Sequence, residues 1–310
     1  MSIKQLRSAI FKNFSTVSKP NLPNKVSSVK LEIAEFIVEL HSQYSINLEQ
    51  GFIPFAIDSS EKSADVLLDC HLFDQLHEPE TKTEVFDSAD NNCRFFKIYK
   101  TADSLYFEIF DQENNSQIQQ IGILSADFRH WDVYCRADGD GGITPLRYPL
   151  APIIMQYLAL QHDAIMIHSS CVTDGVTGRL FSGFSGVGKS TMAGIWNKQG
   201  YTVVNDDRLL VRLQNGKIVA YNTPMYYADR PKKALLNEIF LISHAPQNRK
   251  QQISGSAAVS KVMAFCIQNN FEPVFIEHNI DVISKICSSV KVFTLGFVPD
   301  NDIVDFIINN

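Results

Sequence analysis

Alternation between apolar and polar positions dominates the chain from residue 29 to residue 144. The letters VKLEI at residues 29–33 alternate strictly, which is typical of a strand with one buried face. Clusters of Asp, Asn and Ser, which favour loops, separate this segment from others of the same kind. The further candidate strands are residues 94–98, 105–110 and 118–124. The pattern predicts a β-rich region, 29–144, built as a mostly antiparallel layer.

Residues 145–310 have a different pattern, in which strand-like and helical segments alternate. Residues 148–161 carry apolar side chains at helical spacing and predict a buried helix, and the apolar run 164–168 predicts a short strand. The segments that follow are residues 179–182, 189–199, 201–204, 209–213, 218–221, 234–242, 256–269 and 292–298. This alternation predicts an α/β (α+β) domain over residues 145–310, preceded by the smaller β-rich region.

The first 28 residues predict an extension of the chain. Ile3, Leu6, Ile10 and Phe14 fall at helical spacing between basic residues, and residues 15–28 have the Ser, Pro and Asn content of a linker. Transit peptides and membrane-surface helices also begin with basic amphipathic segments. The simpler interpretation is a short helix that packs on the rest of the protein.

Charge is distributed unevenly along the 310 residues. The whole chain has 28 basic and 34 acidic residues, a net charge of −6, but residues 1–30 contain six basic residues and no acid. The remainder therefore holds 22 basic and 34 acidic residues, a net charge of −12. Because nucleic-acid binding requires a cationic surface, this balance argues against a nucleic-acid partner.

The apolar runs and the cysteines of the sequence bear on the cellular compartment of the protein. The longest uncharged, mostly apolar run covers residues 148–161, which is shorter than the roughly 20 residues that cross a bilayer. The six cysteines are scattered without a CxxC pair, which indicates neither a disulfide framework nor a zinc site. We therefore expect no transmembrane segment and a reduced, cytoplasmic location.

The strongest motif is GFSGVGKS at residues 183–190, which satisfies the phosphate-loop pattern G-x-x-x-x-G-K-[ST]. It follows one candidate strand and opens a candidate helix, whose N-terminus favours anions. Lys189 would reach the β- and γ-phosphates, and Ser190 would ligate Mg²⁺. The predicted nucleotide contacts are Gly183, Ser185, Gly186, Val187, Gly188, Lys189, Ser190 and Thr191. The alternative is a glycine-rich turn without a ligand.

Two adjacent carboxylates, Asp206 and Asp207, follow the candidate strand at 201–204. One carboxylate in this position can hold Mg²⁺, and the other can take a proton from a hydroxyl nucleophile. The alternative is an acidic strand end in solvent. His168 ends the candidate strand 164–168 and, taken alone, is more typical of a hydrogen-bonded core residue.

Taken together, His168, the motif at 183–190 and the acidic pair resemble the catalytic domain of HPr kinase/phosphorylase. The phosphate-loop domain of that family is similar to the one in phosphoenolpyruvate carboxykinase. The resembling stretch covers residues 165–211, and the letters NTP at 222–224 resemble a Thr-Pro turn of the family. The layout also resembles HPr-kinase-like proteins found beside peptide-modification genes.

The resemblance implies a role for each matching residue. Asp206 would be the general base and Asp207 the metal ligand, although the two roles are interchangeable. His168 would orient or share the transferred proton or contact the phosphoryl group. Arg230 would steady the phosphoryl charge, unless it is a surface residue of the basic run 230–233. Homo-oligomerisation is implied by the resemblance alone.

The chain also departs from that family. It lacks the Gly-Ile-rich signature of the bifunctional enzyme, and residues 1–140 do not resemble the regulatory domain of that enzyme, so neither phosphorolysis nor HPr as the substrate is implied. The prediction is an ATP- and Mg²⁺-dependent kinase that phosphorylates a hydroxyl of a peptide, a protein or a small molecule, with Ser as the favoured acceptor. The alternative is a nucleotide-binding regulatory or interaction module without efficient transfer.

Overall fold

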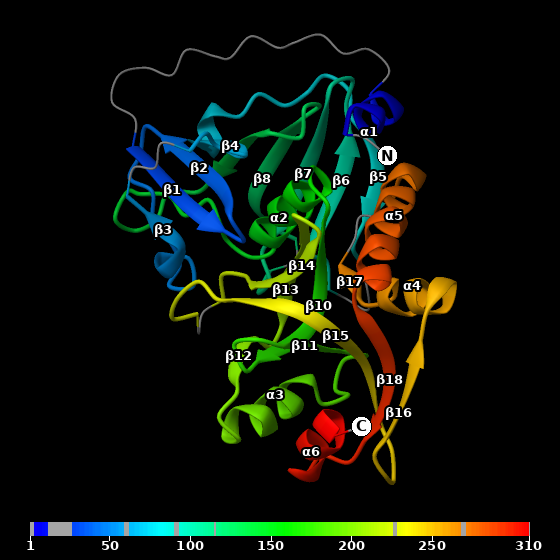
Figure 1. Cartoon of the computed structure of the whole chain (residues 1–310). Helices are drawn as coiled ribbons and strands as arrows, with labels where there is room; N and C mark the ends of the chain where they lie inside the picture. Colours follow the sequence, from blue (N-terminus) through cyan, green and yellow to red (C-terminus); the bar gives the residue numbers. More distant parts are fainter. Residues whose placement is uncertain are drawn as a thin grey trace. The chain divides into compact units, whose positions relative to one another are not determined.

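The computed structural model describes residues 3–11, 27–58, 62–89, 93–114, 116–225, 228–267 and 271–309. The chain forms two compact units (Figure 1). The first unit comprises Met1–Leu158 and Pro224–Arg230, and the second comprises Ala159–Thr223 and Pro231–Asn310. Residues 145–158, which we expected at the start of the second region, are therefore part of the first unit.

The first unit contains a nine-stranded sheet among its described residues. In sheet order the strands are β3 (Ala56–Ile57), β1 (Ser27–Ile33), β2 (Phe36–Ser42), β4 (Val66–Leu72), β9 (His130–Cys135), β8 (Ile118–Ser125), β7 (Ser104–Phe110), β6 (Phe96–Lys100) and β5 (Thr83–Asp87). The pairs β2–β4 and β4–β9 are parallel and the others are antiparallel. The mostly antiparallel layer expected here is present.

Helix α2 (Leu150–Leu160) packs on the apolar face of this sheet. The ring of Tyr157 contacts Phe107 edge to face at 5.6 Å and Trp131 at 5.8 Å, and all three side chains are fully buried. Burial of aromatic rings of this size is a main source of core stability. Two 3₁₀ turns, η1 (Ile53–Phe55) and η2 (Phe73–Gln75), connect strands of the same unit.

The predicted N-terminal helix is present as α1 (Ile3–Ile10). Ile10 and Phe11 are buried, and the ring of Phe11 lies 6.1 Å from that of Phe128. These contacts are those expected of a short helix packed on the protein. Phe14 and most of the predicted linker lie outside the described residues.

The second unit contains a mixed sheet, again of nine strands among the residues described. Its main path is β11 (Gly178–Ser182), β10 (Ala164–Thr173), β13 (Arg208–Gln214), β14 (Lys217–Asn222), β15 (Lys233–His244), β18 (Lys291–Phe297) and β16 (Arg249–Ile253). Two shorter strands, β12 (Thr202–Asn205) and β17 (Cys266–Ile267), pair with β10, and β11 also pairs with β15.

Helices cover both faces of the second sheet. Helices α4 (Gly255–Met263) and α5 (Pro273–Ser289) bury Val262 and Ile283 in one apolar cluster. Helices α3 (Lys189–Lys198) and α6 (Asp302–Asn309) bury Trp196 and Ile303 in another. The mixed α/β class predicted for this part of the chain is therefore present. Helices α5 and α6 and strand β16 were not predicted.

Strand β10 is longer than the sequence pattern predicted. The expected strand stopped at His168, but β10 continues to Thr173 and pairs with β11 on one side and β12 on the other. Ser170 explains the difference, because its hydroxyl is buried and donates to the carbonyl oxygen of Lys189 at 2.9 Å. A polar residue that would indicate a loop is thus accommodated inside a buried strand. His168 therefore lies within the strand.

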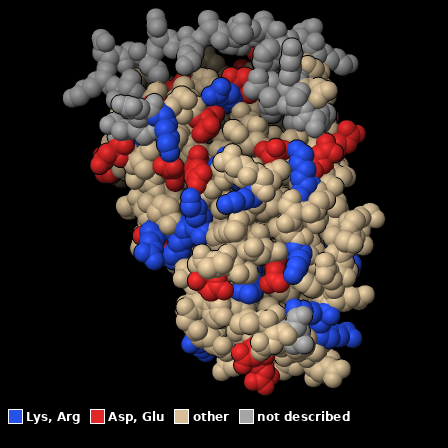
Figure 2. Space-filling model, viewed as in Figure 1, with Lys and Arg blue, Asp and Glu red and all other residues tan. Residues whose placement is uncertain are grey.

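Two observations concern the described helices and the charge on the surface. Among the residues that the structure describes, none of the helices is long and apolar enough to cross a membrane. On the face seen in Figure 2, Lys and Arg side chains are interspersed with Asp and Glu.

Candidate functional site

A glycine loop, residues 183–188, joins β11 to α3 in the second unit. Gly186 and Gly188 have φ angles of +77° and +100°, a left-handed conformation that side chains oppose. A Cβ atom on Gly183 would lie 2.8 Å from Cγ1 of Val187 and 2.9 Å from the carbonyl oxygen of Ile242. Glycine is therefore required at all three positions for reasons of local geometry.

Lys189 begins helix α3 and turns its side chain back into the glycine loop. Its Nζ donates to the carbonyl oxygens of Gly183 at 3.0 Å and Phe184 at 3.1 Å, and the residue is only 6% exposed. Burial lowers the pKa of Lys189, while the nearby Asp207 carboxylate acts in the opposite direction. The ammonium group is thereby held where it would contact an anion bound at the loop. Ser190 and Thr191, the next two residues, are exposed.

His168 and Asp207 form a polar pair in the same unit. Nε2 of His168 lies 3.4 Å from Oδ1 of Asp207, and Nη1 of Arg208 lies 3.3 Å from Oδ2 of the same carboxylate. Burial and the charge of Lys189 lower the pKa of His168, and Asp207 partly offsets them. Burial and the charge of Lys189 therefore favour the neutral form of the imidazole.

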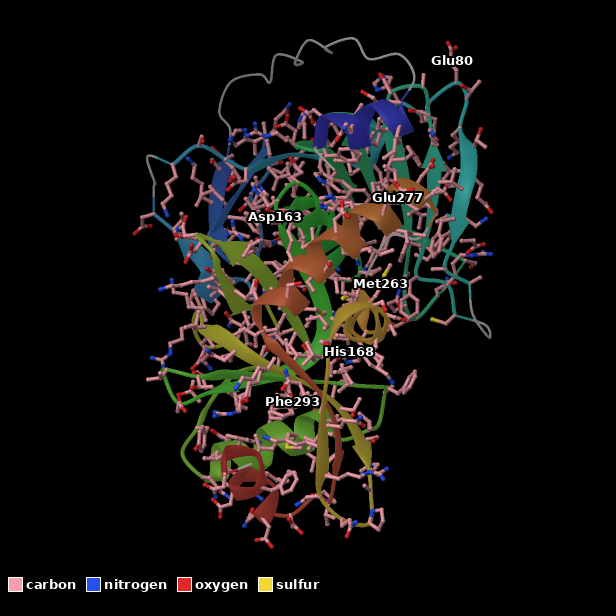
Figure 3. The ribbon with its side chains drawn as sticks, turned by 45° about the vertical axis from the view of Figure 1, so that its right-hand side comes forward. Glu80, Asp163, His168, Met263, Glu277 and Phe293 are labelled. Atoms are coloured by element: carbon pink, nitrogen blue, oxygen red, sulfur yellow. The ribbon has the colours of Figure 1, made fainter. Side chains whose placement is uncertain are left out.

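The backbone fixes where this pair lies. The amide of Ser169 donates to the carbonyl oxygen of Asp207 at 2.9 Å, and the amide of His168 donates to that of Phe265 at 3.0 Å. Figure 3 shows His168 beside the end of α4, where Met263 is labelled. The hydroxyl of Ser182, the last residue before the glycine loop, donates to the carbonyl oxygen of His168 at 2.8 Å. The loop and the histidine are thus attached to one another through β10 and β11.

The acidic pair occupies a two-residue bend between β12 and β13. The Asn205 side chain donates to the carbonyl oxygen of Arg208, and the Thr223 hydroxyl donates to the same oxygen at 2.9 Å. Asn205 and Thr223 are both buried, whereas Asp206 and Asp207 are half-buried. The buried amide and hydroxyl therefore hold the bend from within and leave the carboxylates at the surface.

The structure groups the predicted site residues unevenly. It brings Nε2 of His168 to 3.4 Å from Oδ1 of Asp207. The general-base and metal-ligand roles of the two carboxylates stay predictions. Arg230 is exposed and belongs to the first unit, and within the second unit Nη1 of Arg208 contacts the carboxylate of Asp207.

Sequence reasoning did not assign several residues of this site. Arg208, Asn205 and Thr223 surround the acidic bend, and the position of Arg208 directly after the two aspartates was the available signal. Phe184 was treated only as a variable position of the motif. Its ring is 76% exposed and meets Phe265 edge to face at 5.2 Å, which places an apolar surface on the glycine loop.

The donor set is suited to a nucleotide and a hard cation. Backbone amides at a helix N-terminus and a buried ammonium bind phosphate oxygens. The Ser190 hydroxyl and the carboxylates of Asp206 and Asp207 are oxygen ligands of the kind that Mg²⁺ prefers. Ser190 is exposed and the carboxylates are half-buried, so these oxygens are open to a ligand.

Comparison with known proteins gives distant similarity to solved structures. No protein-family model matches the chain, and no curated protein matches it. Among solved structures, the Hpr(Ser) kinase/phosphatase from Coxiella burnetii matches 47% of this chain and 94% of its own length. The sequences are 10% identical over that match, and the TM-score is 0.28.

Proposed function

We propose that the protein is an ATP- and Mg²⁺-dependent kinase that transfers the γ-phosphoryl group to a hydroxyl, with Ser of a peptide or protein as the favoured acceptor. The observation that carries the proposal is the arrangement around Lys189. Its ammonium is held in the glycine loop, and its carbonyl oxygen accepts from the hydroxyl of Ser170, which follows Ser169, whose amide donates to the carbonyl oxygen of Asp207. An anion-binding cation and a proton acceptor thus act in one place.

Binding would use the loop and the start of α3. The backbone amides of residues 185–189 and the Lys189 ammonium would hold the β- and γ-phosphates, as loops of this geometry do. Ser190 and one carboxylate of the acidic pair would hold Mg²⁺, which neutralises charge on the transferring phosphoryl group when bound.

Transfer would require one proton acceptor beside the attacking hydroxyl. The contact between His168 and Asp207 favours the interchanged assignment, in which Asp207 accepts the proton and Asp206 ligates the metal. The hydroxyl oxygen would form a bond to the γ-phosphorus as the bond from that phosphorus to the β-bridging oxygen breaks. ADP would leave with the electrons of that bond. The hydroxyl proton would pass to Asp207, which His168 orients.

Phe184 and Phe265 support a peptide or protein acceptor more than a small polar one. An exposed phenylalanine on a glycine loop has no role in holding phosphate, and it gives an apolar contact for residues that flank an acceptor serine. Arg208 would neutralise part of the charge of the Asp207 carboxylate until the substrate binds. A role for Arg230 in steadying the phosphoryl group stays a prediction.

One experiment tests the proposal as a whole. The protein is incubated with Mg²⁺, γ-labelled ATP and an array of serine-containing peptides, and both ATP affinity and label transfer are measured. We expect binding and transfer in the wild type, and binding with slowed transfer in His168→Asn. Binding without transfer to any hydroxyl, including water, would favour the nucleotide-binding module instead. Absence of ATP binding would contradict both.

A further inference from the structure

A second group of titratable side chains lies on the first sheet. Alternate residues of a strand share one face, so polar residues two apart on neighbouring strands come together. Strands β2, β4 and β9 pair in parallel and present such residues side by side. The set consists of three imidazoles and three carboxylates: Glu39, His41, Asp69, His71, His130 and Asp132.

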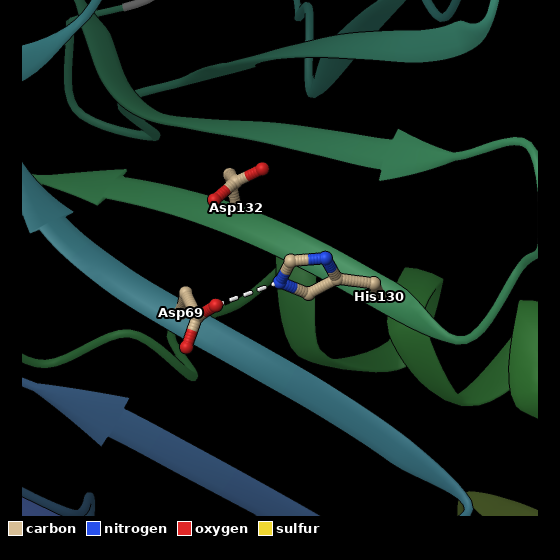
Figure 4. A group of neighbouring side chains, drawn as sticks. All are labelled: Asp69, His130 and Asp132. Carbon is tan, nitrogen blue, oxygen red and sulfur yellow. Dashed lines mark hydrogen bonds and ion pairs between the residues drawn. The ribbon is translucent and has the colours of Figure 1, made fainter. Parts of the chain in front are cut away.

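Three members of this set have their ligand atoms close together. One nitrogen of His130 and one oxygen each from Asp69 and Asp132 lie within 4.8 Å of one another (Figure 4). Nε2 of His130 is 2.8 Å from Oδ2 of Asp69. Nε2 of His71 is 3.2 Å from Oδ1 of Asp132, so this second carboxylate is held by another imidazole.

Asp69 has one carboxylate oxygen that makes no hydrogen bond to any described residue. The residue is 4% exposed, and this oxygen, Oδ1, is buried. Nδ1 of His41 lies 3.7 Å from this oxygen, which is too long for a hydrogen bond. A buried carboxylate oxygen left without a partner is unfavourable, and a cation is the partner that such an oxygen takes best.

We propose that Asp69, His130 and Asp132 bind a divalent transition-metal ion, with His71 as a positioning residue that orients Asp132. Metal–ligand bonds of 2.0–2.2 Å in a tetrahedral site place neighbouring ligand atoms about 3.3 Å apart. The ligand atoms of Asp69, His130 and Asp132 lie within 4.8 Å of one another, and Nε2 of His130 is 2.8 Å from Oδ2 of Asp69. Small side-chain movements would therefore suffice.

The ligand types narrow the choice of ion. An imidazole with two carboxylates suits Zn²⁺ or Mn²⁺, whereas Mg²⁺ and Ca²⁺ prefer oxygen ligands alone. The site would join β4 and β9, which are neighbours in the sheet but distant in sequence. It is separate from the Mg²⁺ site proposed at Ser190 and does not depend on that proposal.

The test measures metal binding by the full chain after treatment with a chelator. Isothermal titration is performed with Zn²⁺, Mn²⁺ and Mg²⁺ in turn, on a background of Asp206→Asn, which removes the carboxylate proposed to ligate Mg²⁺. We expect one equivalent of Zn²⁺ or Mn²⁺ to bind at the cluster. Asp69→Asn or His130→Gln should weaken that binding by about tenfold or more. His77→Gln is the matched control, since His77 is an exposed histidine of the same unit outside the cluster.

Two outcomes would overturn the proposal. One is absence of Zn²⁺ and Mn²⁺ binding, which would leave the cluster as a network of His–Asp hydrogen bonds. The other is unchanged binding in the Asp69→Asn, His130→Gln double variant. If these variants fail to fold, as judged by circular dichroism, X-ray absorption on the Zn²⁺-loaded wild type replaces them. Imidazole and oxygen ligation supports the site, whereas sulfur ligation by the cysteines contradicts it.

Discussion

The two sheets present their charged residues in different ways. In the first unit, histidines and carboxylates occupy alternate positions of regularly paired strands, as Asp69 and Asp132 do on β4 and β9. In the second unit, Lys189 and Asp207 lie where strands stop, at a glycine loop and at a bend. Strand pairing determines the first arrangement, and local backbone geometry determines the second. A substitution at either place should therefore affect a different property.

The largest expected effect is on phosphoryl transfer. Asp207→Asn should leave ATP binding intact and slow transfer by about 10²–10⁴, the usual contribution of a positioned base. Single-turnover labelling measures the rate, and calorimetry measures ATP affinity. Asp206→Asn is the matched variant and should instead raise the Mg²⁺ concentration needed for half-maximal rate. Equal effects of the two variants on the metal requirement would contradict the division of roles.

The second prediction concerns nucleotide affinity. Lys189→Ala removes the ammonium that Gly183 and Phe184 hold in the loop, and should weaken ATP·Mg²⁺ binding by roughly 10- to 100-fold, as charge-assisted hydrogen bonds do. Lys198→Ala, an exposed change in the last turn of the same helix, should bind ATP as the wild type does. Unchanged affinity in Lys189→Ala would mean that the loop is a turn without a nucleotide.

A third prediction compares buried polar groups in the two units. Asn205→Ala should lower the free energy of unfolding by about 1–3 kcal/mol and also slow transfer, because the amide holds the bend that carries Asp207. Ser42→Ala removes a buried hydroxyl that bonds the Cys70 carbonyl in the first sheet, and should cost stability alone. Chemical denaturation and transfer assays measure both effects. Slowed phosphoryl transfer in Ser42→Ala would contradict the expectation that buried polar groups of the first unit affect stability alone.

The smallest effect expected is on pH-dependent stability, measured without metal. The hydrogen bond to Asp69 raises the pKa of His130 against the effect of burial. Burial works to raise the pKa of Asp69, but His130 and the neighbouring imidazoles lower it overall. The stabilisation should therefore be greatest between about pH 4 and pH 6.5. It should decline as the pH rises through the folded-state pKa of His130 or falls through that of Asp69.

The change in the free energy of unfolding with pH should amount to about 1 kcal/mol or less, as for other partly exposed ion pairs. The comparison is between wild-type and His130→Gln unfolding curves from pH 5 to pH 8. The two curves should converge as the pH rises. Parallel curves would mean that the His130–Asp69 contact makes no net contribution.

The same difference between the two sheets explains how much of each group of charged residues could be predicted from the sequence. The glycine loop was predictable because the residues of its motif are adjacent in the sequence. They are also the residues that a tight turn and the start of a helix require. The cluster on the first sheet was not, because Asp69 and His130 are 61 positions apart and meet only through the pairing of β4 and β9. Neither strand was predicted, although the residues of β9 alternate between polar and buried apolar positions.

Two of the differences between the predicted and observed elements have separate physical causes. The strand predicted to stop at His168 continues because Ser169 and Ser170 are buried, which local polarity cannot indicate. Helix α5 was missed although its signal is local. Pro273 opens it, and Phe275, Val282 and Ile286 occur at helical spacing on its buried side.

Residues next to Thr223, which helps to hold the acidic bend, also bear on how the chain divides into two units. The second unit is interrupted at Thr223 and resumes at Pro231, and the intervening residues belong to the first unit. At the base of this excursion, the Asn222 amide donates to the carbonyl oxygen of Lys232, and the Lys232 amide donates to Oδ1 of Asn222. The two ends of the gap are thus already joined by hydrogen bonds. A short glycine connector in place of residues 224–230 would make the second unit one continuous chain, so that the kinase proposal could be examined in a minimal protein.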